Sequence, residues 1–187
     1  MLNYEDKIEK CLSYLKRPSR LTPTGSNPIA YLTYEPKDAF VMRELARTFL
    51  KSKAEYHGFH PHFVSMGEWV DEFINHVDFF IKETWCDESI DENMLYTSIR
   101  QEFESYQFLE NKLLEIQEEY ADDPDTLFII KDVEMLHPFM MMGVIENKIY
   151  NKIKLPIIVL YPGTNQGIAR SFLNIYPQDG TYRSKNF

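Results

Sequence analysis

The chain has 187 residues, of which 44% are hydrophobic, and its 20 Lys and Arg face 29 Asp and Glu for a net charge of −9. This length predicts a single domain spanning 1–187, and the apolar content excludes a disordered tail. Phosphate neutralisation by basic side chains supplies most of the affinity of nucleic-acid-binding proteins. The acidic balance therefore argues against direct nucleic-acid binding by the isolated protein.

The negative charge is concentrated in the middle of the chain. Residues 67–125 carry 18 Asp and Glu but three Lys and Arg, whereas residues 1–66 and 126–187 each have a net charge of +3. One interpretation is a solvated helix face. The other is an acidic surface that docks a basic partner through electrostatic steering.

Cysteine usage and hydropathy give an expectation about location. Cys11 and Cys86 are far apart and form no CxxC pair, which is typical of a reducing compartment. The first residues show no signal-peptide pattern, and no apolar run approaches the length that spans a membrane. We expect a cytoplasmic protein without a membrane segment.

Secondary-structure patterns alternate along the chain. Apolar residues at helical spacing predict an N-terminal helix over 1–17. Four short runs rich in β-branched and aromatic residues predict strands, over 29–34, 62–66, 126–130 and 157–161. Longer amphipathic patterns predict helices, over 38–58, 69–81, 94–120 and 139–153. A weakly alternating tail over 171–176 and a turn at 177–180 suggest a closing hairpin.

This alternation predicts an α/β fold. The sheet is expected to be small, open and mostly parallel, with four or five strands flanked by helices, and 67–125 to form an acidic helical cover or insertion. The topology resembles a P-loop protein, but no glycine lies between Gly25 and Gly58 and no Gly-Lys-Ser/Thr occurs. A Gly-rich loop is what cradles phosphates in that fold. We therefore expect a degenerate P-loop-like fold that lacks its phosphate-binding loop.

Two groups of polar residues could bind a metal ion. Asp132, Glu134 and His137 follow the third predicted strand, where a P-loop enzyme places a Mg²⁺-binding acid. The segment 57–62 contains three histidines, His57, His60 and His62. Neither group has a recognised ligand spacing, and polar loops are the simpler interpretation of both.

The segment 161–170 follows the plainest predicted strand, at the edge where open α/β sheets bind ligands. Gly163 and Gly167 permit a tight turn and a close backbone approach. Arg170 could bind a carboxylate or phosphate, or it could pair within the fold. Five residues of this segment are candidate partner-binding residues: Tyr161, Pro162, Gly163, Gly167 and Arg170.

The end of the sequence resembles the BrxB family of BREX bacteriophage-defence systems. The resemblance lies in the apolar strand and Pro-Gly of 156–163, the Arg-Ser-Phe-Leu of 170–173 and the Gly-Thr-Tyr-Arg of 180–183, which adds Tyr182 and Arg183 to the candidate residues. It implies a non-enzymatic component of a multi-protein assembly, with no catalytic residue, cofactor or metal. The partner it implies is PglZ, the alkaline-phosphatase-like BREX protein, for which this chain would be an adaptor.

Two alternatives remain open. One is a nucleotide- or metal-dependent enzyme that uses Asp132 and Glu134. The other is a nucleic-acid accessory whose basic flanks face DNA within a complex, which requires five basic residues to share a face: Lys148, Lys152, Lys154, Arg170 and Arg183.

Overall fold

The computed structural model describes residues 4–16, 28–167, 169–176 and 184–187. Within them lies a six-stranded sheet in the order β2-β3-β4-β1-β6, with β5 paired to β4. The strands are β1 (Ile29–Tyr34), β2 (His60–Ser65), β3 (Thr126–Lys131), β4 (Ile157–Gln166), β5 (Ala169–Phe172) and β6 (Lys185–Asn186). All pairs are parallel except β4 with β5. The predicted α/β fold with a mostly parallel sheet is confirmed, with one or two more strands than expected.

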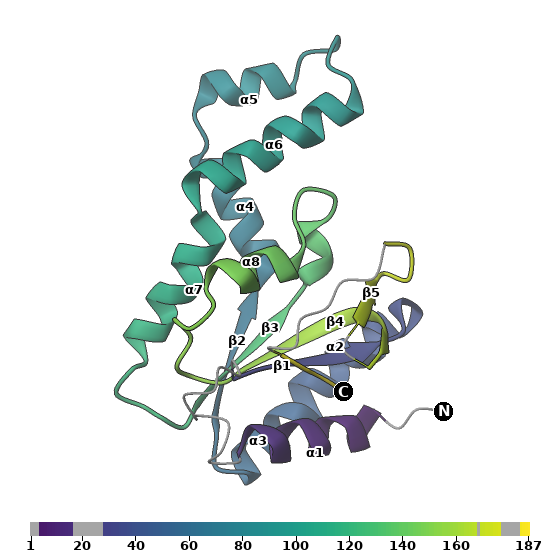
Figure 1. Cartoon of the computed structure of the whole chain (residues 1–187), viewed down its shortest axis with the longest axis vertical. Coiled ribbons are helices and arrows are strands. Elements are labelled where there is room, and N and C mark those ends of the chain that lie inside the picture. The colour runs from purple at the N-terminus through teal and green to yellow at the C-terminus, as the bar shows by residue number, and fades with distance from the viewer. Residues whose placement is uncertain (1–3, 17–27, 168, 177–183) are drawn as a thin grey trace.

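Helices cover both faces of the sheet (Figure 1). One layer contains α1 (Tyr4–Leu15), α2 (Ala39–Leu45), the π-helical turn Ala46–Leu50 and α3 (Lys51–Tyr56). The other contains α4 (Met66–His76), α7 (Phe108–Glu119) and α8 (Met142–Lys148). Short 3₁₀ turns, Pro36–Asp38 and Val133–Leu136, follow β1 and β3.

Successive residues of one strand enter different cores. In β1, Ile29 and Tyr31 pack against the α4, α7 and α8 layer, whereas Ala30 and Leu32 pack against the α1 to α3 layer. A strand buried on both faces has no solvent-facing positions, so it reads as a continuous apolar run. This is why the sequence identified β1, β3 and β4 as strands.

The acidic helices form an arm that projects beyond the sheet, at the top of Figure 1. It consists of α5 (Phe79–Trp85) and α6 (Glu92–Tyr106), which are joined to the body through α4 and α7. Phe73 of α4 stacks on Phe103 of α6 with ring centroids 4.0 Å apart, so the base of the arm is continuous with the core. By contrast, α5 has no buried residue.

Two predicted helices are each broken in two. The helix predicted over 94–120 ends at Gln107, whose φ of 48° is left-handed, and α7 starts beyond it. The helix predicted over 69–81 stops at Val77, which is extended, and Asp78 caps α5 by accepting a hydrogen bond from the Phe80 N–H at 2.8 Å. Each break turns the chain, and together they create the arm.

Other boundaries also differ from the prediction. The helix expected over 139–153 is only α8, because Pro138 and a turn precede it and Ile149 ends it. In the helical segment predicted over 38–58, the apolar residues Phe40 and Val41 are exposed. The turn predicted at 177–180 lies outside the described residues. Among the helices that the structure describes, none is both long and apolar enough to cross a membrane.

Candidate functional site

The segment 161–170 forms a β-hairpin at the carboxyl end of β4. Gly163 pairs with Phe172 and Gln166 pairs with Ala169, so β5 folds back on the extended end of β4. Gly163 has a φ of 149°, and a Cβ there would lie 2.1 Å from the carbonyl oxygen of Ser171. Tyr161, Pro162 and Gly163 are buried, whereas Gly167 is exposed at the turn. The hairpin thus depends on the absence of a side chain at position 163.

Arg170 lies inside the protein. Its side chain is 1% exposed, and its cation sits 3.5 Å from the ring centroid of Tyr31. One terminal nitrogen donates to Ser184 Oγ at 3.0 Å and to Asn186 Oδ1 at 3.1 Å. The other lies 3.7 Å from Oε2 of Glu146. Of the two interpretations of Arg170, pairing within the fold is the one that the structure shows.

Glu146 is the residue in this network that sequence reasoning missed. It lies on α8, is 0% exposed, and accepts a hydrogen bond from the Tyr31 hydroxyl at 2.8 Å. Burial of a carboxylate requires compensation by hydrogen bonds or an opposite charge, and Tyr31 and Arg170 supply both. Its position between Ile145 and Ile149 on an amphipathic helix gave no signal that the side chain turns inward.

The candidate partner-binding residues do not lie together on one surface of the part of the chain that the structure describes. Tyr182 and Arg183 lie outside the described residues, and Arg170 and three others are in the interior. Only Gly167 is exposed among those described. A role of this set in partner binding stays a prediction, whereas its contribution to the hairpin and the buried network is evident from the contacts above.

Asp132 and Glu134 lie at the carboxyl edge of the sheet and bind cations of this chain. Asp132 Oδ2 accepts from Lys131 Nζ at 2.6 Å and from Ser65 Oγ at 2.7 Å. Arg43 of α2 approaches Asp132 at 3.4 Å and donates to Glu134 Oε1 at 2.8 Å. Burial opposes ionisation of Asp132, but the hydrogen bonds from Lys131 and Ser65 hold its pKa below the usual range. Arg43 is far from both acids in the sequence, and no pattern of residues indicated that it joins this cluster.

The histidines do not converge. His137 contacts the Tyr176 hydroxyl, and burial lowers the pKa of its imidazole. His57 contacts Glu9, and His62 packs on Tyr120. Across residues 4–16, 28–167, 169–176 and 184–187, no group of three or more His, Cys, Asp or Glu could hold a metal ion.

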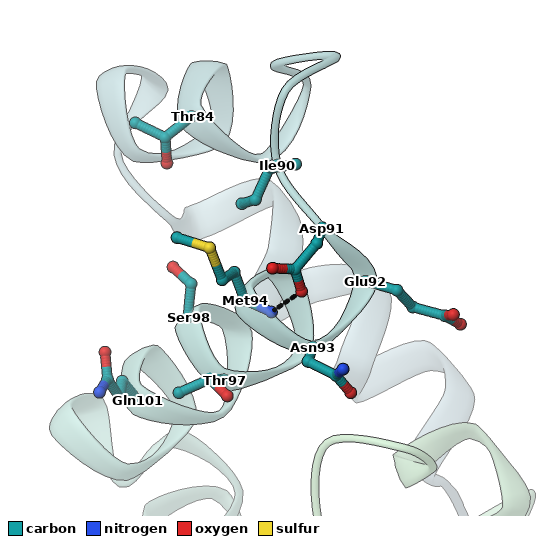
Figure 2. Close-up of a pocket in the computed structure, with 9 residues that line it drawn as sticks. All are labelled: Thr84, Ile90, Asp91, Glu92, Asn93, Met94, Thr97, Ser98 and Gln101. Carbon is teal, nitrogen blue, oxygen red and sulfur yellow. Dashed lines mark hydrogen bonds between the residues drawn. The ribbon is translucent and has the colours of Figure 1, made fainter.

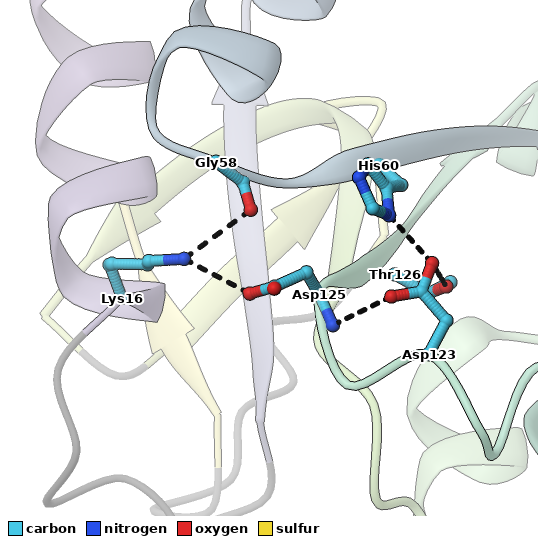
Figure 3. Close-up of polar contacts among 6 residues, drawn as sticks. All are labelled: Lys16, Gly58, His60, Asp123, Asp125 and Thr126. Atoms are coloured by element: carbon cyan, nitrogen blue, oxygen red, sulfur yellow. Dashed lines mark hydrogen bonds and ion pairs between the residues drawn. The ribbon is translucent and has the colours of Figure 1, made fainter.

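His60 instead belongs to a polar cluster where the loop after α7 meets β2 (Figure 3). Its Nδ1 lies 2.6 Å from Asp123 Oδ2, and that carboxylate also accepts from Thr126 Oγ1 at 3.0 Å. Beside it, Lys16 pairs with Asp125 at 3.1 Å. These contacts join α1, β2 and the start of β3, and they account for the polar residues of this loop as structural.

The basic residues of the C-terminal third do not share a face. Lys148 Nζ pairs with the buried Glu110 at 2.9 Å, and Arg170 is internal. Lys152 and Lys154 are exposed, while Arg183 lies outside the described residues. The arrangement that the nucleic-acid accessory requires is therefore contradicted for Arg170.

An open groove lies in the helical arm, between α5 and the first turns of α6 (Figure 2). Its volume is about 820 Å³. Met94 and Ser98 of α6 and Thr84 of α5 point into it, and Ile90 closes one end. The N-cap Asp91 accepts a hydrogen bond from the Met94 N–H at 3.0 Å. The sequence did not reveal this groove because it was expected to form fewer and longer helices.

The family comparison matches most of this architecture. A family model described as BREX protein BrxB matches residues 64–187, more than half of the chain. The chain belongs to the BrxB family. This BrxB protein is therefore a component of a BREX phage-defence system, with other BREX proteins as its partners. No curated protein and no solved structure gives a significant match to it.

The matched region of this BrxB chain starts within β2 and takes in the arm, β3, β4 and the hairpin. It contains Arg170 and Glu146 but not their neighbour Tyr31 on β1. The resemblance inferred from the last residues is thus confirmed over a longer region. The helices α1 to α3, which cover the other face, lie outside the match.

Substitution of the two hairpin glycines of this BrxB protein should have unequal effects. Gly163→Ala is expected to lower the free energy of unfolding by more than about 2 kcal/mol, because backbone strain and overpacking each cost roughly 1–3 kcal/mol. Gly167→Ala, with a φ of 67° but open space around it, should cost about 1 kcal/mol. Urea unfolding measures both, and equal losses would contradict the close approach of Ser171 to Gly163.

The contact between His60 and Asp123 should be visible in an NMR titration. The hydrogen bond that His60 donates to Asp123, together with the charge of that carboxylate, raises the pKa of His60, and the same bond lowers the pKa of Asp123. Asp123→Asn should move the pKa of His60 down toward its ordinary value, whereas Asp125→Asn should move it less. An unchanged His60 pKa in Asp123→Asn would show that the contact does not form in solution.

The sign of the pH effect on stability follows from these shifts. The raised pKa of His60 stabilises the fold below the ordinary histidine pKa, and this contribution is lost as pH rises through the folded-state value. The lowered pKa of Asp123 contributes above the ordinary carboxyl pKa and is lost as pH falls through its folded-state value. The pair therefore stabilises most between the pKa values of Asp123 and His60.

Proposed function

We propose that this BrxB protein is a non-enzymatic adaptor whose direct partner in the BREX system is PglZ. Membership of the family supports a role within a multi-protein system, because other BREX proteins are its partners. The choice of PglZ rests on the resemblance of the C-terminal motif. The adaptor role rests on how the surface of this chain is built.

The observation that carries the adaptor role is the helical arm. No residue of α5 is buried, and its aromatic residues Phe79 and Phe80 are 65% and 74% exposed. Exposed aromatic surface on a projecting element is typical of a protein interaction site. The arm also extends away from the sheet, so a partner can reach it without displacing any strand (Figure 1).

The carboxyl edge of the sheet supports a non-enzymatic role. The carboxylate of Asp132 accepts two hydrogen bonds and lies beside the Arg43 cation, which also pairs with Glu134. Acids held in this way by the chain's own cations are poor ligands for Mg²⁺, because binding would require breaking those pairs. The turn after β1, Glu35 and Pro36–Asp38, contains no glycine to cradle a phosphate. These features favour a degenerate P-loop-like fold, which we include in the proposal.

Co-expression with the PglZ of the same system tests the adaptor role. We expect the two purified proteins to elute together in size-exclusion chromatography at micromolar concentration and low salt, because the acidic arm steers association. No residue of α5 is buried, so binding there should leave the folded state of this chain unchanged in its circular dichroism spectrum. Separate elution under these conditions would overturn the proposal.

One observation favours the enzymatic alternative. Glu134 Oε2 is buried and, among the described residues, accepts no hydrogen bond. An orphaned carboxylate oxygen beside Asp132 is a place where a cation could bind.

Thermal unfolding with added Mg²⁺-ATP, Mn²⁺ or Zn²⁺ separates this alternative from the adaptor. We expect no shift in Tm for the wild-type chain or for a Glu134→Gln variant. A ligand present at 100 times its Kd would add about 2.7 kcal/mol to the stability of the folded state. A Tm increase in the wild type that Glu134→Gln abolishes would establish the ligand site and contradict the absence of a cofactor.

A further inference from the structure

The groove between α5 and α6 indicates which kind of partner segment the arm binds, a conclusion that rests on the proposed adaptor function. We propose that this groove is the binding site for a basic amphipathic helix of the partner protein. Its volume of about 820 Å³ is large enough for several side chains, and the helices α5 and α6 that line it lie beyond the sheet (Figure 1).

The apolar part of this binding site is Met94, with Ile90 at one end. Met94 is 61% exposed and points from α6 toward α5 across the groove. A methionine side chain is flexible and polarisable, so it adapts to an apolar side chain of a partner better than a branched residue does. The indole N–H of Trp85 on α5 donates to Ser98 Oγ on α6 at 2.9 Å, a contact that joins the two helices that line the groove.

The charge around the groove selects a cationic occupant. Residues 82–101, which include every lining residue of the groove, carry five Asp and Glu against Lys82 and Arg100, a net charge of −3. Asp91 and Glu92 line the groove, and Asp87 and Glu88 lie on the exposed loop that leads to it. An acidic occupant, such as the arm of a second copy of this chain, would be repelled by this charge. A basic segment is therefore the favoured occupant of the groove.

The walls of the groove favour a helix over an extended strand. Both walls are α-helices, which offer no strand edge with which an extended peptide could pair. An extended peptide would bury its own main-chain groups against these walls without partners. A helix satisfies its main chain internally and can place one apolar side chain on Met94 while its basic residues face the acidic loop.

Titration calorimetry of purified full-length PglZ with variants of this chain tests whether the groove is the binding site. Met94→Lys removes the apolar contact and adds a repelling charge, and Thr97→Lys adds a charge at an exposed position that lines the groove. We expect each variant to raise the Kd about tenfold and to weaken its salt dependence, because part of the electrostatic attraction is lost.

Met135→Lys is the matched control, since Met135 is 51% exposed, lies in the turn after β3 and is not among the residues that line the groove. It should leave the Kd within about twofold, a difference well below 1 kcal/mol. Circular dichroism and Tm of the three variants, measured without PglZ, check that each has the wild-type fold. A variant that fails this check is replaced by Gln101→Lys, which also lines the groove.

The possible outcomes distinguish the proposed binding site in the groove from the proposed adaptor function. If the wild type binds and the Kd and salt dependence are unchanged in Met94→Lys and Thr97→Lys, the proposed binding site is wrong. The adaptor function would then remain intact. Equal weakening by Met135→Lys would also overturn the proposed binding site, because the effect would then be one of net charge. Absence of wild-type binding to PglZ would overturn the adaptor function and, with it, this occupant of the groove.

Discussion

Two opposite charges, Arg170 and Glu146, lie in the interior of the protein with almost no access to solvent. Withdrawing an ion from water costs several kcal/mol even after relaxation, so such a pair persists only when further contacts compensate it. The Tyr31 ring beneath the guanidinium, the Tyr31 hydroxyl on Glu146, and the side chains of Ser184 and Asn186 provide that compensation. These contacts come from β1, α8, β5 and the segment around β6, so four parts of the chain must be in place together.

This requirement explains how a strand as short as β6 stays on the sheet. Its two residues pair with Ala30 and Tyr31 of β1, which alone is a small contribution. The side chain of Asn186 reaches Arg170, and Lys7 of α1 donates to the main-chain oxygen of Thr33 at 2.8 Å and to that of Phe187 at 3.3 Å. The edge of the sheet is therefore closed by these side-chain contacts together with the main-chain hydrogen bonds that join Phe187 to Tyr31 at 2.9 Å and to Thr33 at 3.0 Å.

The sequence predicted the parts of the fold that depend on burial over several residues. Strands β1, β3 and β4 are buried on both faces, and helices α1 and α4 have a regular apolar side, so their patterns were unambiguous. The breaks at Gln107 and Val77 were missed because neither residue is a glycine or proline, and their conformations are set by packing at the base of the arm. The groove depends on those breaks. Arg170 was noticed from its position, but its partner Glu146 is more than twenty residues away and could be assigned only from three-dimensional contacts.

The parallel pairing of β1 with β4 has a consequence for the order in which the chain folds. Ile29 lies beside Ile157, and the other neighbour of β1 is Lys185 and Asn186. Contacts between residues so distant in sequence form late, because the entropy of closing a long loop must be overcome first. During synthesis β1 leaves the ribosome long before either of its neighbours exists, with both edges and both apolar faces uncovered. Until β4 is made, both edges of β1 stay unpaired, and only the helices can shield its faces, α1 to α3 on one side and α4, α7 and α8 on the other.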